Sequence, residues 1–123
     1  MHGADMPAEA LPIPVDLNRS GRSAEGTVYV FLTTRGARIS LAKQGIELRD
    51  GMILNFYDED VNSHGDRDDL VFQGEVHYSE SQGWYACVQS EAIKNLSEVA
   101  GDPGHWANRV DWVAVHETER TWY

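Results

Sequence analysis

Short runs of β-branched and aromatic residues, separated by turn signals, dominate the chain from Gly26 onward. The run 27–33, Thr-Val-Tyr-Val-Phe-Leu-Thr, is dense in residues that favour strands and predicts one. Further strands are predicted over 52–57, 70–79 and 84–90, and the alternation around Trp112 and Val115 predicts a last strand over 109–117. Each is short, as expected for a small sheet protein.

The predicted strand 70–79 carries two different faces and enters a hairpin. One face holds Leu70, Phe72, Val76 and Tyr78, and the other holds Gln73, Glu75 and His77. The run 80–84 is typical of a three-residue hairpin loop with Gly83 in the left-handed conformation. In that register Tyr78 lies opposite Ala86 and Val76 opposite Val88, whereas a loop longer or shorter by one residue would exchange the two faces.

Helical signals are fewer. Residues 35–36 and 48–51 read as turns, and 40–45 predicts one helical turn with Ser40 as its N-cap and Gly45 closing it. Residues 91–100 predict a short helix capped by Ser90 and stopped by the run 101–104, Gly-Asp-Pro-Gly.

Residues 1–25 differ from the rest of the chain. They hold three of the four prolines and show neither a helical nor an alternating period. We interpret 1–25 as a flexible N-terminal leader, with an extended segment at 13–17 lying against the domain. Residues 26–123 then form a single domain, in keeping with a length of 123 residues.

About five strands joined by hairpins, with one short helix, predict a mainly β protein: a small antiparallel barrel or a strongly curved sheet. The run 27–33, the Leu48-Arg49-Asp50-Gly51 turn before a hydrophobic strand, the hairpin at Gly83 and the helix after it resemble small uncharacterised bacterial SH3-like β-barrel proteins. The resemblance covers residues 26–100. It implies an SH3-like fold and a tendency to bind partners, and it carries over no catalytic residue.

Charge narrows the classes of partner. The chain has ten Lys and Arg residues and twenty Asp and Glu residues, which gives a net charge of −10. Such a surface repels phosphate backbones and anionic lipid, so we expect no membrane partner and disfavour nucleic acid. The exception is 26–57, with four basic and two acidic residues, where Arg35, Arg38 and Arg49 are an alternative nucleic-acid site. The single cysteine, Cys87, and an N-terminus without a basic or apolar signal region predict a cytoplasmic protein.

The loop 58–69 holds six carboxylates in twelve positions. Asp58, Asp60 and Asn62 have the alternating spacing that begins an EF-hand, and Asp66 adds a carboxylate, so divalent-cation binding is an alternative function. However, Ser63 and Asp69 stand where that motif needs glycine and glutamate. A solvated acidic loop is therefore the favoured interpretation.

Catalytic motifs are weak. The sequence has no Gly-rich phosphate loop and no serine nucleophile elbow, so no cofactor is predicted. A pairing of Cys87 with His77 across two strands would make an activated thiolate, but a lone cysteine is more often a small hydrophobic residue. We expect a protein that is not an enzyme.

Aromatic residues are the remaining signal. Trp84, Trp106 and Trp112 either close the ends of the barrel or lie at its surface, and Trp122 and Tyr123 are either a frayed end or a contact site. Surface Trp and Tyr are common anchors of protein recognition. The leading hypothesis is a non-enzymatic cytoplasmic interaction module that binds a protein partner, or a second copy, through Trp122, Tyr123, Trp84 and Tyr85.

Overall fold

A computed structural model describes residues 11–17, 20–23, 25–61 and 63–109 of the chain. This part is mainly β, as predicted, with a sheet of seven strands in the order β1-β4-β5-β6-β3-β2, in which β7 also pairs with β5. The strands are β1 (Ile13–Pro14), β2 (Gly21–Arg22), β3 (Thr27–Phe31), β4 (Ile53–Asp58), β5 (Leu70–Ser79), β6 (Gly83–Gln89) and β7 (Lys94–Asn95). The helices are α1 (Arg35–Gln44), α2 (Leu96–Val99) and the 3-10 turns η2 (Ser90–Ala92) and η3 (Trp106–Arg109).

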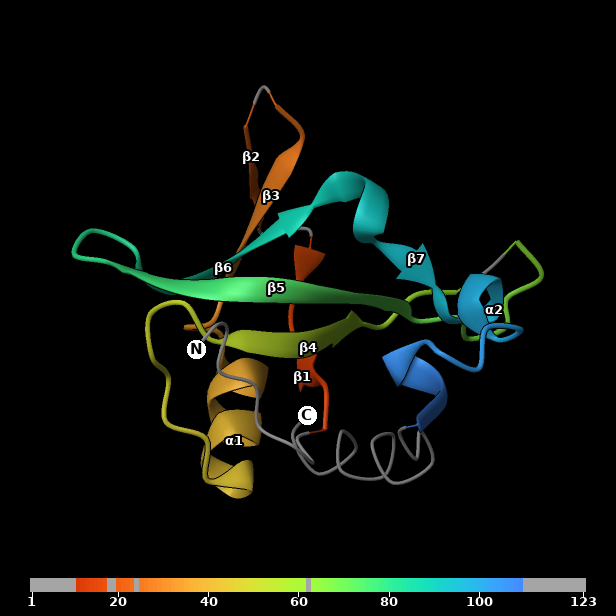
Figure 1. Ribbon diagram of the computed structural model, residues 1–123, viewed down its shortest axis with the longest axis horizontal. Helices are drawn as coiled ribbons and strands as arrows, with labels where there is room; N and C mark the ends of the chain where they lie inside the picture. Colours follow the sequence, from red (N-terminus) through yellow and green to blue (C-terminus); the bar gives the residue numbers. More distant parts are fainter. Residues whose placement is uncertain (1–10, 18–19, 24, 62, 110–123) are drawn as a thin grey trace.

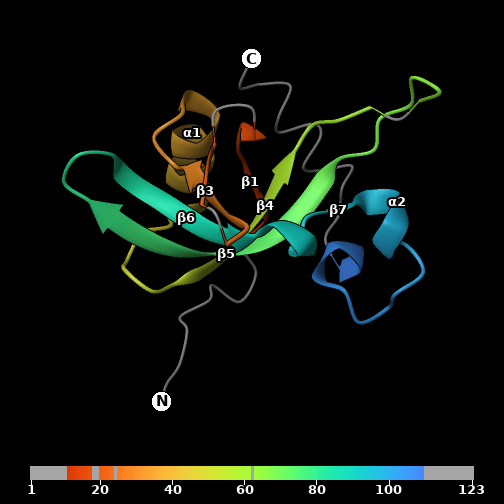
Figure 2. The ribbon, with the colours of Figure 1, turned by 90° about the horizontal axis from the view of Figure 1, so that it is seen from above.

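The sheet is strongly twisted and does not close on itself, because its path ends at β1 on one side and β2 on the other. Figure 1 shows β2 and β3 standing steeply against β4 and β5. Figure 2 shows β5 and β6 curving around the side that carries α1. The sequence predicts either a small barrel or a strongly curved sheet, and the structure has the curved sheet. It is built on the antiparallel strands β3, β4, β5 and β6.

The N-terminal segment belongs to the sheet. Ile13 and Pro14 pair in parallel with Phe56 and Tyr57 of β4, and Ile13 is fully buried. Gly21 and Arg22 pair with β3. The expected extended segment at 13–17 is therefore present, but the predicted start of the fold near Gly26 is too late, since β1 and β2 precede it.

The helix α1 is longer than predicted. It begins at Arg35, with Thr34 as N-cap, where the sequence indicated a turn at 35–36 and a helical start only at Ser40. Ala37, Ser40 and Leu41, at helical spacing, are all buried against the sheet, so packing stabilises the first turn. The end of the helix was predicted correctly. Gly45 adopts the left-handed conformation, and its backbone N–H donates to the carbonyl oxygens of Ala42 and Leu41.

The β5–β6 hairpin has the predicted loop but a different register. Gly83 is left-handed with φ 78°, as expected. Val76 pairs with Ala86 and Tyr78 with Trp84, so the predicted pairing was wrong by two residues. A shift of two preserves the faces. Val76 is buried in the core, while Tyr78 is 55% exposed near the hairpin end.

The single helix predicted for 91–100 is wrong. Ser90 begins only the turn η2, and Lys94 and Asn95 extend to pair with β5. Asn95 then caps α2, because its side chain and that of Glu98 form a reciprocal capping box. Of the strand predicted for 109–117, Arg109 ends η3 and residues 110–117 lie outside the described residues.

Both sides of the sheet carry a core. Phe56 and Phe72 belong to the larger cluster, together with Ala37 and Leu41 of α1. Their neighbours Tyr57 and Val71 point to the opposite face, where Val99, Ala107 and Trp106 cover them. This second cluster occupies only the β7 end of its face, so the other end of that face is where a surface site can form. Among the residues that the structure describes, no helix is long and apolar enough to cross a membrane.

Candidate functional site: an aromatic groove

An aromatic groove of about 390 Å³ lies on the sheet face opposite α1. It is lined by Gly21, Tyr29, Phe31, Ser79, Gln82 and Tyr85, none of which is charged. The strand pattern explains its composition. In β3 the buried residues are Val28 and Val30, so Tyr29 and Phe31 point the other way.

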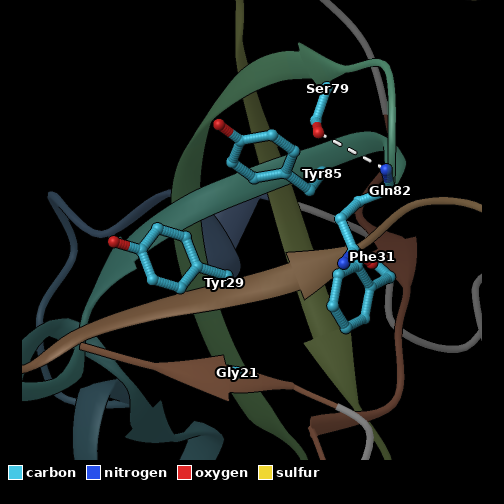
Figure 3. A pocket seen from close by; sticks show the side chains of 6 residues that line it. All are labelled: Gly21, Tyr29, Phe31, Ser79, Gln82 and Tyr85. Carbon is cyan, nitrogen blue, oxygen red and sulfur yellow. Dashed lines mark hydrogen bonds between the residues drawn. The ribbon is translucent and has the colours of Figure 1, made fainter.

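The pairing of β3 with β6 brings these rings together. Phe31 lies opposite Tyr85, and Tyr29 lies opposite Cys87. The rings of Tyr29 and Tyr85 meet edge to face, with centroids 6.1 Å apart. Figure 3 shows them side by side on neighbouring strands, with Gln82 reaching toward Phe31 from the hairpin loop. The groove therefore presents both faces and edges of aromatic rings.

Gly21 keeps the groove open at the β2 side. It pairs with Tyr29, and a Cβ added at Gly21 would lie 3.8 Å from Tyr29 Cδ2. That distance is ordinary van der Waals contact, so alanine fits here. A larger side chain would extend over the Tyr29 ring and fill the space that the groove occupies.

An acidic pair lies next to the groove. His77 faces Tyr85 across the β5–β6 pair, with ring centroids 5.9 Å apart. Its Nδ1 is 3.0 Å from Asp50 Oδ1 and its Nε2 is 2.9 Å from Glu75 Oε1. Asp50 and Glu75 are 73% and 52% exposed. Two carboxylates around one imidazole leave a net negative charge at neutral pH, whichever way the imidazole is protonated.

The geometry argues against an activated thiolate. Cys87 lies opposite Glu75, whereas His77 lies opposite Tyr85 and is engaged by two carboxylates. Burial, with a smaller contribution from the Glu75 charge, raises the pKa of the Cys87 thiol. A raised pKa lowers the thiolate fraction at neutral pH, which is the opposite of what nucleophilic catalysis needs.

Trp84 and Tyr85, the two sequence-predicted contact residues that the structure describes, lie on opposite faces of the sheet. Tyr85 lines the groove, but Trp84 points to the α1 side, packs against the larger core cluster and meets Tyr78 edge to face at 5.1 Å. Trp106 packs on the smaller cluster. Trp112, Trp122 and Tyr123 lie outside the described residues.

The acidic loop is held by hydrogen bonds within itself and by one from the N-terminal segment. Asp58 Oδ2 accepts the Leu17 N–H at 3.0 Å, and the Asp60 carbonyl accepts the Asp68 N–H at 2.8 Å. Buried Asp69 receives two hydrogen bonds from the Arg67 guanidinium. Asp66 is exposed.

These placements give the metal prediction no support. Asn62 lies outside the described residues. Within the described ranges, no three His, Cys, Asp or Glu side chains gather as they would around a metal ion.

Two of the three arginines of the alternative nucleic-acid site come together. Arg35 and Arg38 line a hollow of about 620 Å³ beside α1, together with Ile39, Ala42 and Ile46. Arg49 is not among its lining residues and lies in the turn before β4. The three side chains therefore do not form one basic patch around that hollow.

Comparison of the chain with protein-family models, with curated proteins and with solved structures finds no match. The SH3-like resemblance therefore stays a prediction. Of the groove residues, Tyr85 was predicted from the sequence as a contact residue, whereas Tyr29, Phe31 and Gly21 were not. The alternation in β3 could have identified the two aromatic residues. Val28 and Val30 form the buried face of the strand, so Tyr29 and Phe31 must lie on the other face.

Proposed function

We propose that this protein is a non-enzymatic, cytoplasmic interaction module that binds a partner protein through the aromatic groove. The observation that carries the proposal is the grouping of Tyr29, Phe31 and Tyr85 around an open space on the sheet face away from α1. Rigid aromatic side chains give large contact area at a low cost in conformational entropy, which is why they are frequent binding hot spots.

The framework under the groove suits this role. The three rings stand on β3 and β6, and the adjacent core residues Val28, Val30, Ala86 and Val88 are almost completely buried. A site on packed strands holds its side chains in place better than a site on loops. The groove volume of about 390 Å³ also falls within the range of ligand sites in proteins.

Substitutions that fill or strip the groove test the proposal. We expect Gly21→Leu to block it and Tyr85→Ala to remove a contact surface, each weakening partner binding by about 2 kcal/mol, roughly thirtyfold in Kd. Gly21→Ala and Tyr78→Ala are the matched controls, because alanine fits at Gly21 and Tyr78 lies outside the groove lining.

The measurement is affinity capture from native extract with each variant as bait, followed by titration of the captured protein against purified variants. Circular dichroism checks that each variant is folded, and size exclusion shows whether the partner is a second copy. Capture that survives both Gly21→Leu and Tyr85→Ala at wild-type strength would contradict the proposal.

A further inference from the structure

The groove combines three features that select the chemistry of its occupant. Its walls are ring faces and edges of Tyr29, Phe31 and Tyr85. Its hairpin end carries the side-chain oxygens of Ser79 and Gln82. Ser79 Oγ accepts the backbone N–H of Gln82 at 3.4 Å (Figure 3) and shares a second hydrogen bond with Ser81 Oγ at 3.1 Å, so it keeps room for one more donor when it donates to Ser81. Its lining brings no cation.

Negative charge beside the groove favours a cationic ligand over an anionic one. Asp50 and Glu75 hold His77 against Tyr85, and this group keeps a net negative charge. Glu80 is exposed in the hairpin loop next to Ser79. The whole chain carries −10. An anionic ligand would meet repulsion from each of these charges, whereas a cation is attracted to the groove from a distance.

We propose that the groove binds an arginine side chain presented by the partner protein. This inference rests on the proposed function and names the chemistry of that partner. A guanidinium is planar, weakly hydrated and stacks on aromatic faces, so it suits the rings of Tyr29 and Tyr85. Its five N–H donors suit the oxygens of Ser79 and Gln82.

Other cations fit the same lining less well. A lysine ammonium is compact and strongly hydrated, so it loses more on entering a groove with three aromatic walls. A quaternary ammonium has no N–H donor and would leave the acceptors of Ser79 and Gln82 unused. Arginine matches the aromatic and the polar parts of the lining together.

Titration with defined peptides tests this inference. The probe is a blocked alanine peptide with two arginines, and its matched control carries citrulline, which keeps the shape and removes the charge. Amide spectra of the 15N-labelled full chain should shift at Tyr29, Phe31 and Tyr85, and citrulline should weaken binding by about fivefold or more. A lysine peptide should bind more weakly than the arginine peptide.

Protein variants separate the groove from general attraction to an acidic surface. Gly21→Leu should abolish the shifts, while Gly21→Ala should keep them. Tyr85→Leu keeps the apolar bulk and removes the ring, so it should also weaken the shifts. It replaces Gly21→Leu in the test if that variant does not fold. The double change Asp50→Asn with Glu75→Gln should weaken binding about two- to fivefold and reduce its dependence on salt, because exposed charges act at a range that salt screens.

Three results would overturn the inference. These are equal binding of the arginine and citrulline peptides, shifts confined to residues away from the groove, and no binding of either peptide. If any of them occurs while Gly21→Leu still weakens partner capture, the groove is the binding site but its occupant is not arginine. If Gly21→Leu and Tyr85→Ala leave capture unchanged, the proposed function fails as well.

Discussion

Gly74, at the centre of β5, has no room for a side chain. A Cβ built there would lie 2.9 Å from Val88 Cγ2, 3.1 Å from Ala86 Cβ and 3.1 Å from Phe56 Cε2. Contacts under 3.0 Å do not occur without movement, and two of the three neighbours are short side chains with no far end to swing away. We therefore expect Gly74→Ala to force β4, β5 and β6 apart locally.

Two opposing effects set the magnitude. Overpacking a well-filled core costs about 1–3 kcal/mol. Replacing glycine reduces the entropy of the unfolded chain, which returns about 0.4–1 kcal/mol. The net expectation is a protein less stable by about 1–2 kcal/mol. Urea denaturation followed by tryptophan fluorescence measures it, with a midpoint shift at unchanged slope.

A second substitution shows whether the clash is the cause. Val88→Ala removes the closest atom and alone should cost about 2 kcal/mol. In the double variant the new methyl occupies part of the vacated space, so the combined loss should fall short of the sum by about 1 kcal/mol. Gly101→Ala is the control, because nothing lies within 4 Å of its Cβ. An additive cycle, or a Gly74→Ala protein as stable as wild type, would refute the steric argument.

Three further substitutions test the other contacts that hold the framework. Ile13→Ala should lower the free energy of unfolding by about 2–4 kcal/mol, because Ile13 is fully buried. A loss under about 0.5 kcal/mol in urea would mean that β1 contributes nothing. Burial raises the pKa of the Asp58 carboxyl above its ordinary value of 3.8. At a pH above the raised pKa, the ionised carboxylate therefore lowers the free energy of unfolding, and this destabilisation disappears as the pH falls toward 3.8. Asp58→Asn, which keeps an acceptor for Leu17, should therefore gain stability relative to wild type at pH 7 and lose that gain by pH 4; thermal melts showing a constant difference would contradict this. Arg67→Met should cost about 2–4 kcal/mol in urea, since it removes two hydrogen bonds from buried Asp69; an unchanged midpoint would show that the pair adds nothing.

The strands were predictable because their signal is local. The predicted 27–33, 52–57 and 70–79 correspond to β3 at Thr27–Phe31, β4 at Ile53–Asp58 and β5 at Leu70–Ser79. In β3 each buried residue alternates with a partly exposed one, and that period is readable from five residues alone.

The elements missed at sequence level depend on distant partners. Gly36 reads as a turn, yet it lies in the first turn of α1, where its Cβ position is in ordinary van der Waals contact, at 3.7 Å, with Pro14 Cγ of β1. Pro14 in turn reads as a strand breaker, but it lies in β1, at the end of the sheet path, where proline is tolerated. Neither contact is visible until the two segments, more than twenty residues apart, are placed together.

Part of the groove could be predicted from the sequence, because it depends only on which face of a strand each residue occupies. Face assignment in the hairpin needs only the parity of the register, and the observed register differs from the predicted one by an even number of residues. Tyr85 and His77 therefore stay on the outer face, and Trp84 stays on the core face, under either pairing. Gly21 could not be identified, because the pairing of β2 with β3 is what places it beside Tyr29. A leucine at that position would leave the local sequence pattern almost unchanged and would close the groove, so the binding site depends on a residue whose importance appears only after the sheet is assembled.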